Sequence, residues 1–261
     1  MSDMFERCIE IACEAGEKIM EIYKTDFDVQ TKSDDSPLTQ ADLAAHRCIV
    51  AGLQQLAPEI PVLSEEGREL DYATRKQWTR YWLVDPLDGT KEFIKKNDEF
   101  TVNIALIDNG VPVMGVVHAP ALKITYAGNS DGAVKISDGE RQTIACRKTA
   151  DEPTLVVSRS HQDEALQKML AGIGEHQAVS RGSSLKFCIV AEAGADLYPR
   201  TGPTSEWDTA AGQAVVEAAG GQVLKLDDWQ PLRYNQKESL LNPGFAVIGE
   251  PAYGWPDKLG G

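Results

Sequence analysis

Basic side chains are scarce in this sequence. Its 26 lysines and arginines stand against 40 aspartates and glutamates, and the formal net charge is −14. A surface of this sign repels nucleic acid, which proteins bind through many basic contacts to phosphate groups. A nucleic acid polymer is therefore not an expected partner. A small phosphorylated molecule remains a possible ligand, because metal ions and a few local basic residues can make the electrostatic potential positive inside one cleft.

Cysteine is also rare, and long apolar runs are missing. The five cysteines are odd in number and scattered through apolar periodic stretches, which argues against a disulfide framework or a zinc site and favours a reducing, cytoplasmic compartment. No apolar run reaches the length of a transmembrane helix, and the first residues carry acids where a secretory signal carries bases. Any association with the inner face of a membrane is expected to be peripheral, and both a monomer and a homodimer stay open.

The spacing of apolar residues predicts helices and strands in the first half of the chain. We expect a helix capped by Asp3 that runs to Tyr23, and a second helix from Thr39 to Leu56. Strands are expected at 62–63 and 82–84, at 124–127 and 134–136, and in an antiparallel hairpin around the turn 108–110.

The second half repeats this mixture after a polar segment at 148–153, where we place the boundary between two lobes, 1–150 and 151–261. We expect strands at 155–157 and 197–198, and helices near 163–170, 185–191 and 205–219. Helices on both faces of the sheets predict an α+β fold, a layered α-β-α-β-α sandwich whose sheets are largely antiparallel.

An acidic cluster is predicted where two strands end. Asp85 and Asp88 follow one expected strand and Glu65 follows another. Carboxylates of this kind, with the backbone carbonyl of Leu87, suit Mg²⁺, a small hard cation that prefers oxygen ligands. The bland alternative is a tight turn, since Asp, Pro and Gly are common turn residues.

Two further positions bear on this site. Gly89 lets the backbone approach a ligand closely, and Thr90 begins a short helix whose free N–H groups would bind a phosphate oxygen. Two more aspartates are ambiguous on their own, because Asp42 and Asp208 each stand three residues after a Thr or Ser and have the spacing of a helix cap.

Together these residues resemble the inositol monophosphatase superfamily of lithium-sensitive, Mg²⁺-dependent phosphatases. Two segments carry the resemblance, Trp-Leu-Val-Asp-Pro-Leu-Asp-Gly-Thr-Lys-Glu-Phe at 82–93 and Trp-Asp-Thr-Ala-Ala-Gly at 207–212, and it extends from 38–42 to 242–245. It implies two or three Mg²⁺ ions per site. The ligands it implies are Glu65, Asp85 and the Leu87 carbonyl for one ion, and Asp85, Asp88 and Asp208 for a second.

Within the superfamily the chain is most similar to the 3′(2′),5′-bisphosphate nucleotidases. Lys-Glu-Phe at 91–93 and Gly-Ser-Ser-Leu-Lys-Phe-Cys at 182–188 carry this likeness, whereas the inositol-cleaving branch has Thr-Asn-Phe after Gly-Thr. The resemblance implies that Ser183, Lys186 and Arg200 bind a 5′-phosphate and that His161 lies near an adenine. Without the resemblance, the sequence would indicate that Lys186 is an exposed helix lysine and Arg200 a loop arginine.

The implied activity is Mg²⁺-dependent hydrolysis of the 3′-phosphate of adenosine 3′,5′-bisphosphate to AMP and phosphate, and of its sulfated analogue, in support of sulfur assimilation. Thr90 and Asp42 would orient the water and take its proton, Glu65 would act beside them, and Gly89 and Asp208 would contact the substrate. The alternatives are an inositol monophosphatase or fructose-1,6-bisphosphatase of the same superfamily, and a non-catalytic metal or phosphate sensor.

Overall fold

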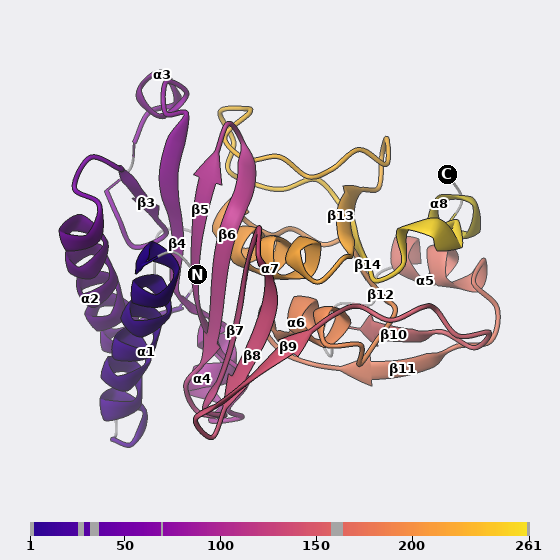
Figure 1. Ribbon diagram of the computed structural model, residues 1–261, viewed down its shortest axis with the longest axis horizontal. Helices are drawn as coiled ribbons and strands as arrows, with labels where there is room; N and C mark the ends of the chain where they lie inside the picture. Colours follow the sequence, from indigo (N-terminus) through magenta and orange to yellow (C-terminus); the bar gives the residue numbers. More distant parts are fainter. Residues whose placement is uncertain (1–2, 26–28, 32–36, 69, 158–163, 260–261) are drawn as a thin grey trace.

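The computed structural model describes residues 3–25, 29–31, 37–68, 70–157 and 164–259, and their helices and strands form five layers (Figure 1). Two helices cover one face of a seven-stranded sheet, and two more lie between that sheet and a five-stranded one. Short helices cover the outer face of the smaller sheet. The predicted α-β-α-β-α sandwich is confirmed. Within the described residues, no helix is long and apolar enough to cross a membrane.

The outer helices of the first layer are α1 (Asp3–Tyr23) and α2 (Gln40–Leu56). Their apolar stripes pack together and onto the larger sheet, where Ile11, Ile49 and Val116 share one core. Thr39 caps α2 as predicted. The expected cap at Asp3 is wrong, because Asp3 already lies in the first turn of α1, where its charge suits the helix dipole.

The seven-stranded sheet has the order β3-β4-β5-β6-β7-β8-β9. Its strands are β3 (Val62–Ser64), β4 (Arg80–Asp88), β5 (Thr101–Asp108), β6 (Val111–Ala119), β7 (Ile124–Asn129), β8 (Gly132–Ser137) and β9 (Glu140–Ile144). The predicted hairpin is β5 and β6, with Asn109 and Gly110 in the left-handed conformation that a two-residue turn requires, at φ of 49° and 77°.

One strand pair in this sheet is parallel. β3 pairs parallel to β4, so both run toward the same edge of the sheet, while the remaining neighbours pair antiparallel. β4 continues beyond the expected end at Val84 as far as Asp88, with an irregular register between Asp85 and Asp88. A short strand pair, β1 (Val29–Thr31) with β2 (Pro37–Thr39), precedes α2.

The middle layer holds α6 (Leu185–Ala191) and α7 (Glu206–Ala218). α7 lies almost directly on the larger sheet, since a Cβ atom at Gly115 of β6 would come within 2.4 Å of the carbonyl oxygen of Ala211. Val117, Phe187 and Val247 share the core on this side, so the two halves of the chain pack into one hydrophobic interior.

The five-stranded sheet has the order β11-β10-β12-β14-β13. Its strands are β10 (Thr154–Val157), β11 (Gln177–Ser180), β12 (Leu197–Arg200), β13 (Gln222–Lys225) and β14 (Phe245–Ile248). β10 pairs parallel to β11 and β12, and β14 pairs antiparallel to β12 and β13. The larger sheet is therefore largely antiparallel as expected, while the smaller one is mixed. α5 (Glu164–Ala171), a 3₁₀ turn (Pro251–Tyr253) and α8 (Trp255–Lys258) complete this half.

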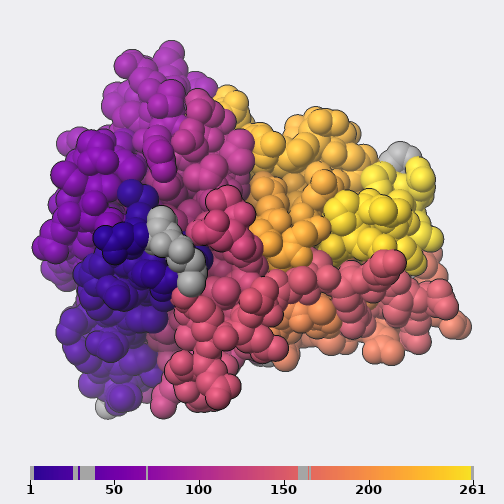
Figure 2. All heavy atoms as spheres, viewed as in Figure 1, coloured from indigo at the N-terminus to yellow at the C-terminus, as the bar shows by residue number. Residues whose placement is uncertain are grey.

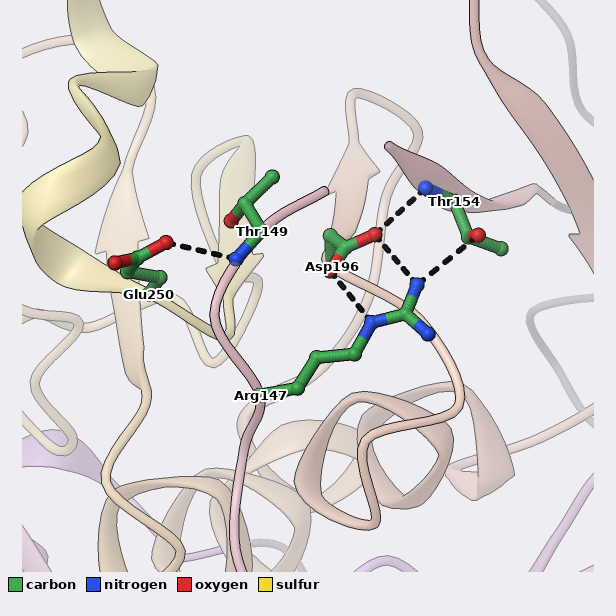
Figure 3. A network of polar contacts seen from close by, with 5 residues as sticks. All are labelled: Arg147, Thr149, Thr154, Asp196 and Glu250. Carbon is green, nitrogen blue, oxygen red and sulfur yellow. Dashed lines mark hydrogen bonds and ion pairs between the residues drawn. The ribbon is translucent and has the colours of Figure 1, made fainter. Parts of the chain in front are cut away.

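The segment between β9 and β10 leads from one sheet to the other. Arg147 donates to both carboxylate oxygens of the buried Asp196, at 2.8 and 2.7 Å, and the backbone N–H of Thr154 donates to the same carboxylate at 2.7 Å (Figure 3). The N–H of Thr149 donates to Glu250 at 2.7 Å. Figure 2 shows the early and late parts of the chain at opposite ends of the molecule.

Candidate active site

Three carboxylates from two elements meet where β4 ends. Asp85 and Asp88 lie on β4, and Asp208 lies in the first turn of α7. One oxygen of each lies within 4.8 Å of the others. The expected meeting of these three aspartates is therefore observed, and the close packing of α7 on the larger sheet makes it possible.

The buried position of Asp85 is fixed locally. Its side chain is 1% exposed, and Oδ1 accepts the backbone N–H of Leu87 at 3.0 Å across Pro86, which has no N–H of its own. Glu65 follows β3, and its N–H donates to the carbonyl of Val84 at 3.1 Å, which brings the two strand ends together. These hydrogen bonds fix the carboxylate of Asp85 within the Asp-Pro-Leu-Asp segment, which is a continuation of the strand.

The electrostatics of this cluster favour a bound cation. Burial raises the pKa of Asp85 well above its ordinary range. The charges of Glu65, Asp88 and Asp208 raise it further. Burial and the charge of Asp88 raise the pKa of Asp208 to about 8. Carboxylate oxygens held together in this way suit a hard divalent cation such as Mg²⁺, whose charge removes their mutual repulsion. The residues present therefore fit the metal that the sequence suggested.

Asp208 is both a helix cap and a member of the cluster. Its Oδ2 accepts the backbone N–H of Ser205 at 2.7 Å, while the carboxylate also lies beside Asp85 and Asp88. The capping contact that the spacing predicted is therefore confirmed, and it is compatible with a place in the acidic cluster, because a helix N-terminus stabilises an anion that can also face a cation.

Asp88 is held by serines from the loop before α6. The Ser183 hydroxyl donates to Oδ2 of Asp88 at 2.5 Å, and Ser184 Oγ lies 3.0 Å from the same oxygen and 2.8 Å from the carbonyl of Asp208. Asn103 donates to Ser184 at 2.9 Å. Ser183 thus contacts the acidic cluster as well as the adjoining cavity. Sequence reasoning missed Ser184, although it stands in the same Gly-Ser-Ser motif.

Asp42 and Thr90 also lie together. Oδ2 of Asp42 accepts the backbone N–H and the hydroxyl of Thr39, at 2.8 and 2.6 Å, and the Thr90 hydroxyl lies 3.4 Å from Oδ1. The same hydroxyl lies 3.4 Å from the carbonyl oxygen of Leu87. Burial raises the pKa of Asp42 above its usual value, in spite of these hydrogen bonds.

A cavity of about 410 Å³ opens beside the carboxylates. Its lining includes Asp88, Gly89 and Asp208 from the neighbourhood of the acidic cluster, together with Lys186 and Arg200 from the second half of the chain. Lys186 Nζ lies 5.7 Å from the centre of the Tyr198 ring, and burial lowers the pKa of this lysine, so it is not an exposed helix lysine.

Arg200 is held in place by backbone carbonyls. Its Nε donates to Gly202 at 3.2 Å and its Nη2 to Pro203 at 3.3 Å. The same cavity is lined by three basic residues that the sequence did not mark as site residues, namely Lys91, Lys95 and Arg181, although Lys91 belongs to the Lys-Glu-Phe motif. The spacing of Lys91 and Lys95 by four residues along one helix face was the available signal. His161 lies outside the described residues.

Fold and site together define a metal-dependent phosphatase. It is a layered α/β sandwich in which clustered carboxylates lie beside a cavity lined by lysine and arginine side chains. The model of the inositol monophosphatase family matches residues 1–247, and the chain belongs to this family.

Two curated relatives and a solved structure cover nearly the whole chain. The chain is 54% identical over 248 residues to a protein of Shigella flexneri named 3′(2′),5′-bisphosphate nucleotidase CysQ, and the match covers 94% of this chain and 99% of that protein. The protein of the same name from Escherichia coli K12 is 53% identical with the same coverage. The crystal structure of CysQ from Bacteroides thetaiotaomicron superposes with a TM-score of 0.83 at 45% identity, over 94% of this chain and 96% of that one.

Proposed function

We propose that this protein is a 3′(2′),5′-bisphosphate nucleotidase that removes the 3′-phosphate from adenosine 3′,5′-bisphosphate to give AMP and phosphate. The observation that carries the proposal is a single cavity lined both by Asp88 and Asp208 of the acidic cluster and by Lys186 and Arg200. A substrate with two phosphates matches this lining. One phosphate would bind metal ions held by the carboxylates, and the other would bind the basic side chains of Lys186 and Arg200. The identity of 53–54% to proteins named for this activity supports the same substrate class.

The acidic cluster would hold the metal ions, two or three of them. In this proposal Glu65, Asp85 and the carbonyl of Leu87 hold one Mg²⁺, while Asp85, Asp88 and Asp208 hold a second. Bound Mg²⁺ supplies charge neutralisation and lowers the pKa of water at the site. Residues 1–150 contribute most of these ligands, and residues 151–261 contribute Asp208 and the groups for the second phosphate.

Thr90 and Asp42 would handle the proton of the attacking water. The Thr90 hydroxyl, 3.4 Å from Asp42, orients the water and relays its proton to the carboxylate. The buried surroundings that raise the pKa of Asp42 also make it a better proton acceptor. Gly89 contributes close backbone approach, because its φ of 88° and the nearness of Ser183 leave little room for a side chain.

The far phosphate would lie on the cations of the second half. Lys186 and Arg200 bind the 5′-phosphate in this proposal, and Ser183 contributes its hydroxyl. Half-buried cations suit a dianion, because their electrostatic attraction is stronger away from bulk water.

Phosphate release from a panel of phosphomonoesters tests the proposal. The panel contains adenosine 3′,5′-bisphosphate, its 5′-phosphosulfate analogue, inositol 1-phosphate and fructose 1,6-bisphosphate, each with Mg²⁺ and with EDTA. We expect the highest kcat/KM for adenosine 3′,5′-bisphosphate, cleavage of the sulfated analogue to adenosine 5′-phosphosulfate, and no release in EDTA. A higher kcat/KM for the inositol or fructose ester would overturn the nucleotide assignment.

A further inference from the structure

A buried arginine joins the first half of the chain to the loop that surrounds the start of α7. Arg75 is the last residue of α3 (Tyr72–Arg75) and is 2% exposed. Its Nη1 donates to Oδ1 of Asn235 at 2.5 Å, and its Nη2 donates to the carbonyls of Lys237, at 3.1 Å, and Glu238. The amide of Asn235 donates back to the carbonyl of Arg75 at 2.6 Å. Two segments 160 residues apart are therefore fixed to each other.

The same loop holds the first residue of α7 from two sides. The backbone N–H of Asn235 donates to both carboxylate oxygens of Glu206, at 3.1 and 2.9 Å. The backbone N–H of Glu206 donates to the carbonyl of Leu240 at 2.8 Å. Glu206 is 2% exposed and stands two residues before Asp208. The contacts of Arg75 therefore extend through Asn235 to the turn of α7 that carries an aspartate of the cluster.

This arrangement costs stability. It buries a guanidinium and a carboxylate, and within the described part of the chain Nε of Arg75 and the hydroxyl of Tyr81 have no hydrogen-bond partner. Tyr81 lies on β4, the strand that carries Asp85 and Asp88. A well-packed apolar cluster would hold the same elements at lower cost. The charges of Glu206 and Arg75 both act on the Tyr81 hydroxyl, so the cluster lies near β4 and is hydrogen-bonded to the first residue of α7. A costly polar cluster at this position points to a requirement for orientation.

We propose that Arg75 and Asn235 are positioning residues for Asp208. Through Glu206 they hold the first turn of α7 at the spacing from β4 that places the three aspartates within reach of one ion. Neither residue lines the cavity or belongs to the acidic cluster. The inference rests on the proposed metal-binding role of Asp208, and it adds two residues that no local sequence pattern marks.

Calorimetric titration of the full-length protein with Mg²⁺, together with thermal unfolding, tests this role. Arg75→Met removes the guanidinium but keeps an unbranched apolar side chain. Asn235→Gly removes only the side-chain contacts, because glycine tolerates the φ of 58° and keeps the N–H that Glu206 accepts. We expect each variant to bind Mg²⁺ about 10-fold more weakly, the effect typical of residues that orient metal ligands.

Arg147→Met is the matched control. It removes an arginine from the buried carboxylate of Asp196 in the network of Figure 3, which joins the two sheets through another segment. We expect this variant to unfold at a lower temperature and to bind Mg²⁺ as the wild type does. Equal weakening of Mg²⁺ binding in Arg75→Met and Arg147→Met would overturn the inference, because general destabilisation would then explain both.

Asp208→Asn separates the inference from the proposed function. If Asp208→Asn binds Mg²⁺ like the wild type, the metal-binding role of Asp208 is wrong. If Asp208→Asn weakens Mg²⁺ binding while Asn235→Gly and Arg75→Met keep wild-type affinity, the metal site stands and the positioning role is overturned. Should Arg75→Met fail to fold, Asn235→Gly decides by the same titration, since it leaves the arginine in place.

Discussion

The carboxylate of Asp42 accepts hydrogen bonds from Thr39 with one oxygen and faces the hydroxyl of Thr90 with the other. Oδ2 accepts the N–H and hydroxyl of Thr39 at the start of α2, whereas Oδ1 lies 3.4 Å from the Thr90 hydroxyl. Capping fixes the orientation of the carboxylate and leaves Oδ1 facing the Thr90 hydroxyl. A cap and a catalytic relay are therefore compatible roles for one side chain.

Asp42→Asn separates these roles. Asparagine keeps one oxygen for the N–H of Thr39, so α2 stays capped, but the amide cannot take a proton. We expect kcat at saturating Mg²⁺ to fall by about 100-fold or more, the usual range for a lost general base, with little change in Tm. Thr90→Ser keeps the hydroxyl and should retain most of the activity. Wild-type turnover in Asp42→Asn would mean that Asp42 is only a cap.

The long elements could be predicted from sequence because their signals are local. α1, α2, the hairpin of β5 and β6, and α7 each show several periods of apolar residues or a distinctive turn. The strands β1, β2, β9, β11, β13 and β14 were missed. They have three to five residues each, and β9 and β11 are largely exposed, so neither length nor alternation separates them from loops.

The residues of the site also differ in whether a local sequence signal marks them. Asp85, Asp88 and Thr90 stand in one segment whose turn residues and acids could be interpreted together. Arg75 could not be found, because its partner Asn235 is 160 residues away and neither has a distinctive local context. The extension of β4 through Asp88 also escaped prediction, since Pro86 reads as a strand end although its missing N–H is tolerated where the register is irregular.

Asp85→Asn should stabilise the metal-free protein and abolish its activity. The carboxylate is 1% exposed and lies among other acids, so replacing it with a neutral amide relieves repulsion in the absence of Mg²⁺. In EDTA at neutral pH we expect the free energy of unfolding to rise by about 1 kcal/mol or more, as in other stability–activity trade-offs. Chemical denaturation with and without Mg²⁺ measures the change.

The response to Mg²⁺ provides the check on Asp85→Asn. Ligand binding stabilises the folded wild type by mass action, so Mg²⁺ should raise its Tm, whereas the variant should gain much less. If Asp85→Asn is less stable than the wild type in EDTA and still gains the same Tm from Mg²⁺, the cluster is neither strained nor a metal site.

Lys186→Met should weaken binding of the far phosphate selectively. Methionine keeps an unbranched side chain against Tyr198 and removes the charge, so KM for adenosine 3′,5′-bisphosphate should rise by about 10-fold or more. KM for adenosine 3′-phosphate, which has no 5′-phosphate, should hardly change. Lys95→Met, at another cavity lysine, is the control and should affect neither KM strongly. Equal effects of Lys186→Met on both substrates would remove the basis for nucleotide preference.

A buried histidine in the larger sheet should make stability depend on pH. His118 on β6 is 8% exposed, and its Nδ1 lies 2.8 Å from the hydroxyl of Thr125 and 4.0 Å from Sγ of Cys13. A Cβ atom at Gly16 of α1 would come within 2.6 Å of the ring, so the helix packs directly on it. Burial lowers the pKa of His118 from 6.5 to about 4.

The sign of this dependence follows from which state binds the proton. Between about pH 6.5 and pH 4 the unfolded chain binds a proton at His118 that the folded chain does not, so the free energy of unfolding falls as the pH falls through this window, by about 3 kcal/mol in total. Above it the contribution is constant. Urea unfolding of the wild type and His118→Asn across this range should give curves that converge toward low pH. Curves that stay parallel would show that His118 is protonated in the folded protein as readily as in the unfolded chain.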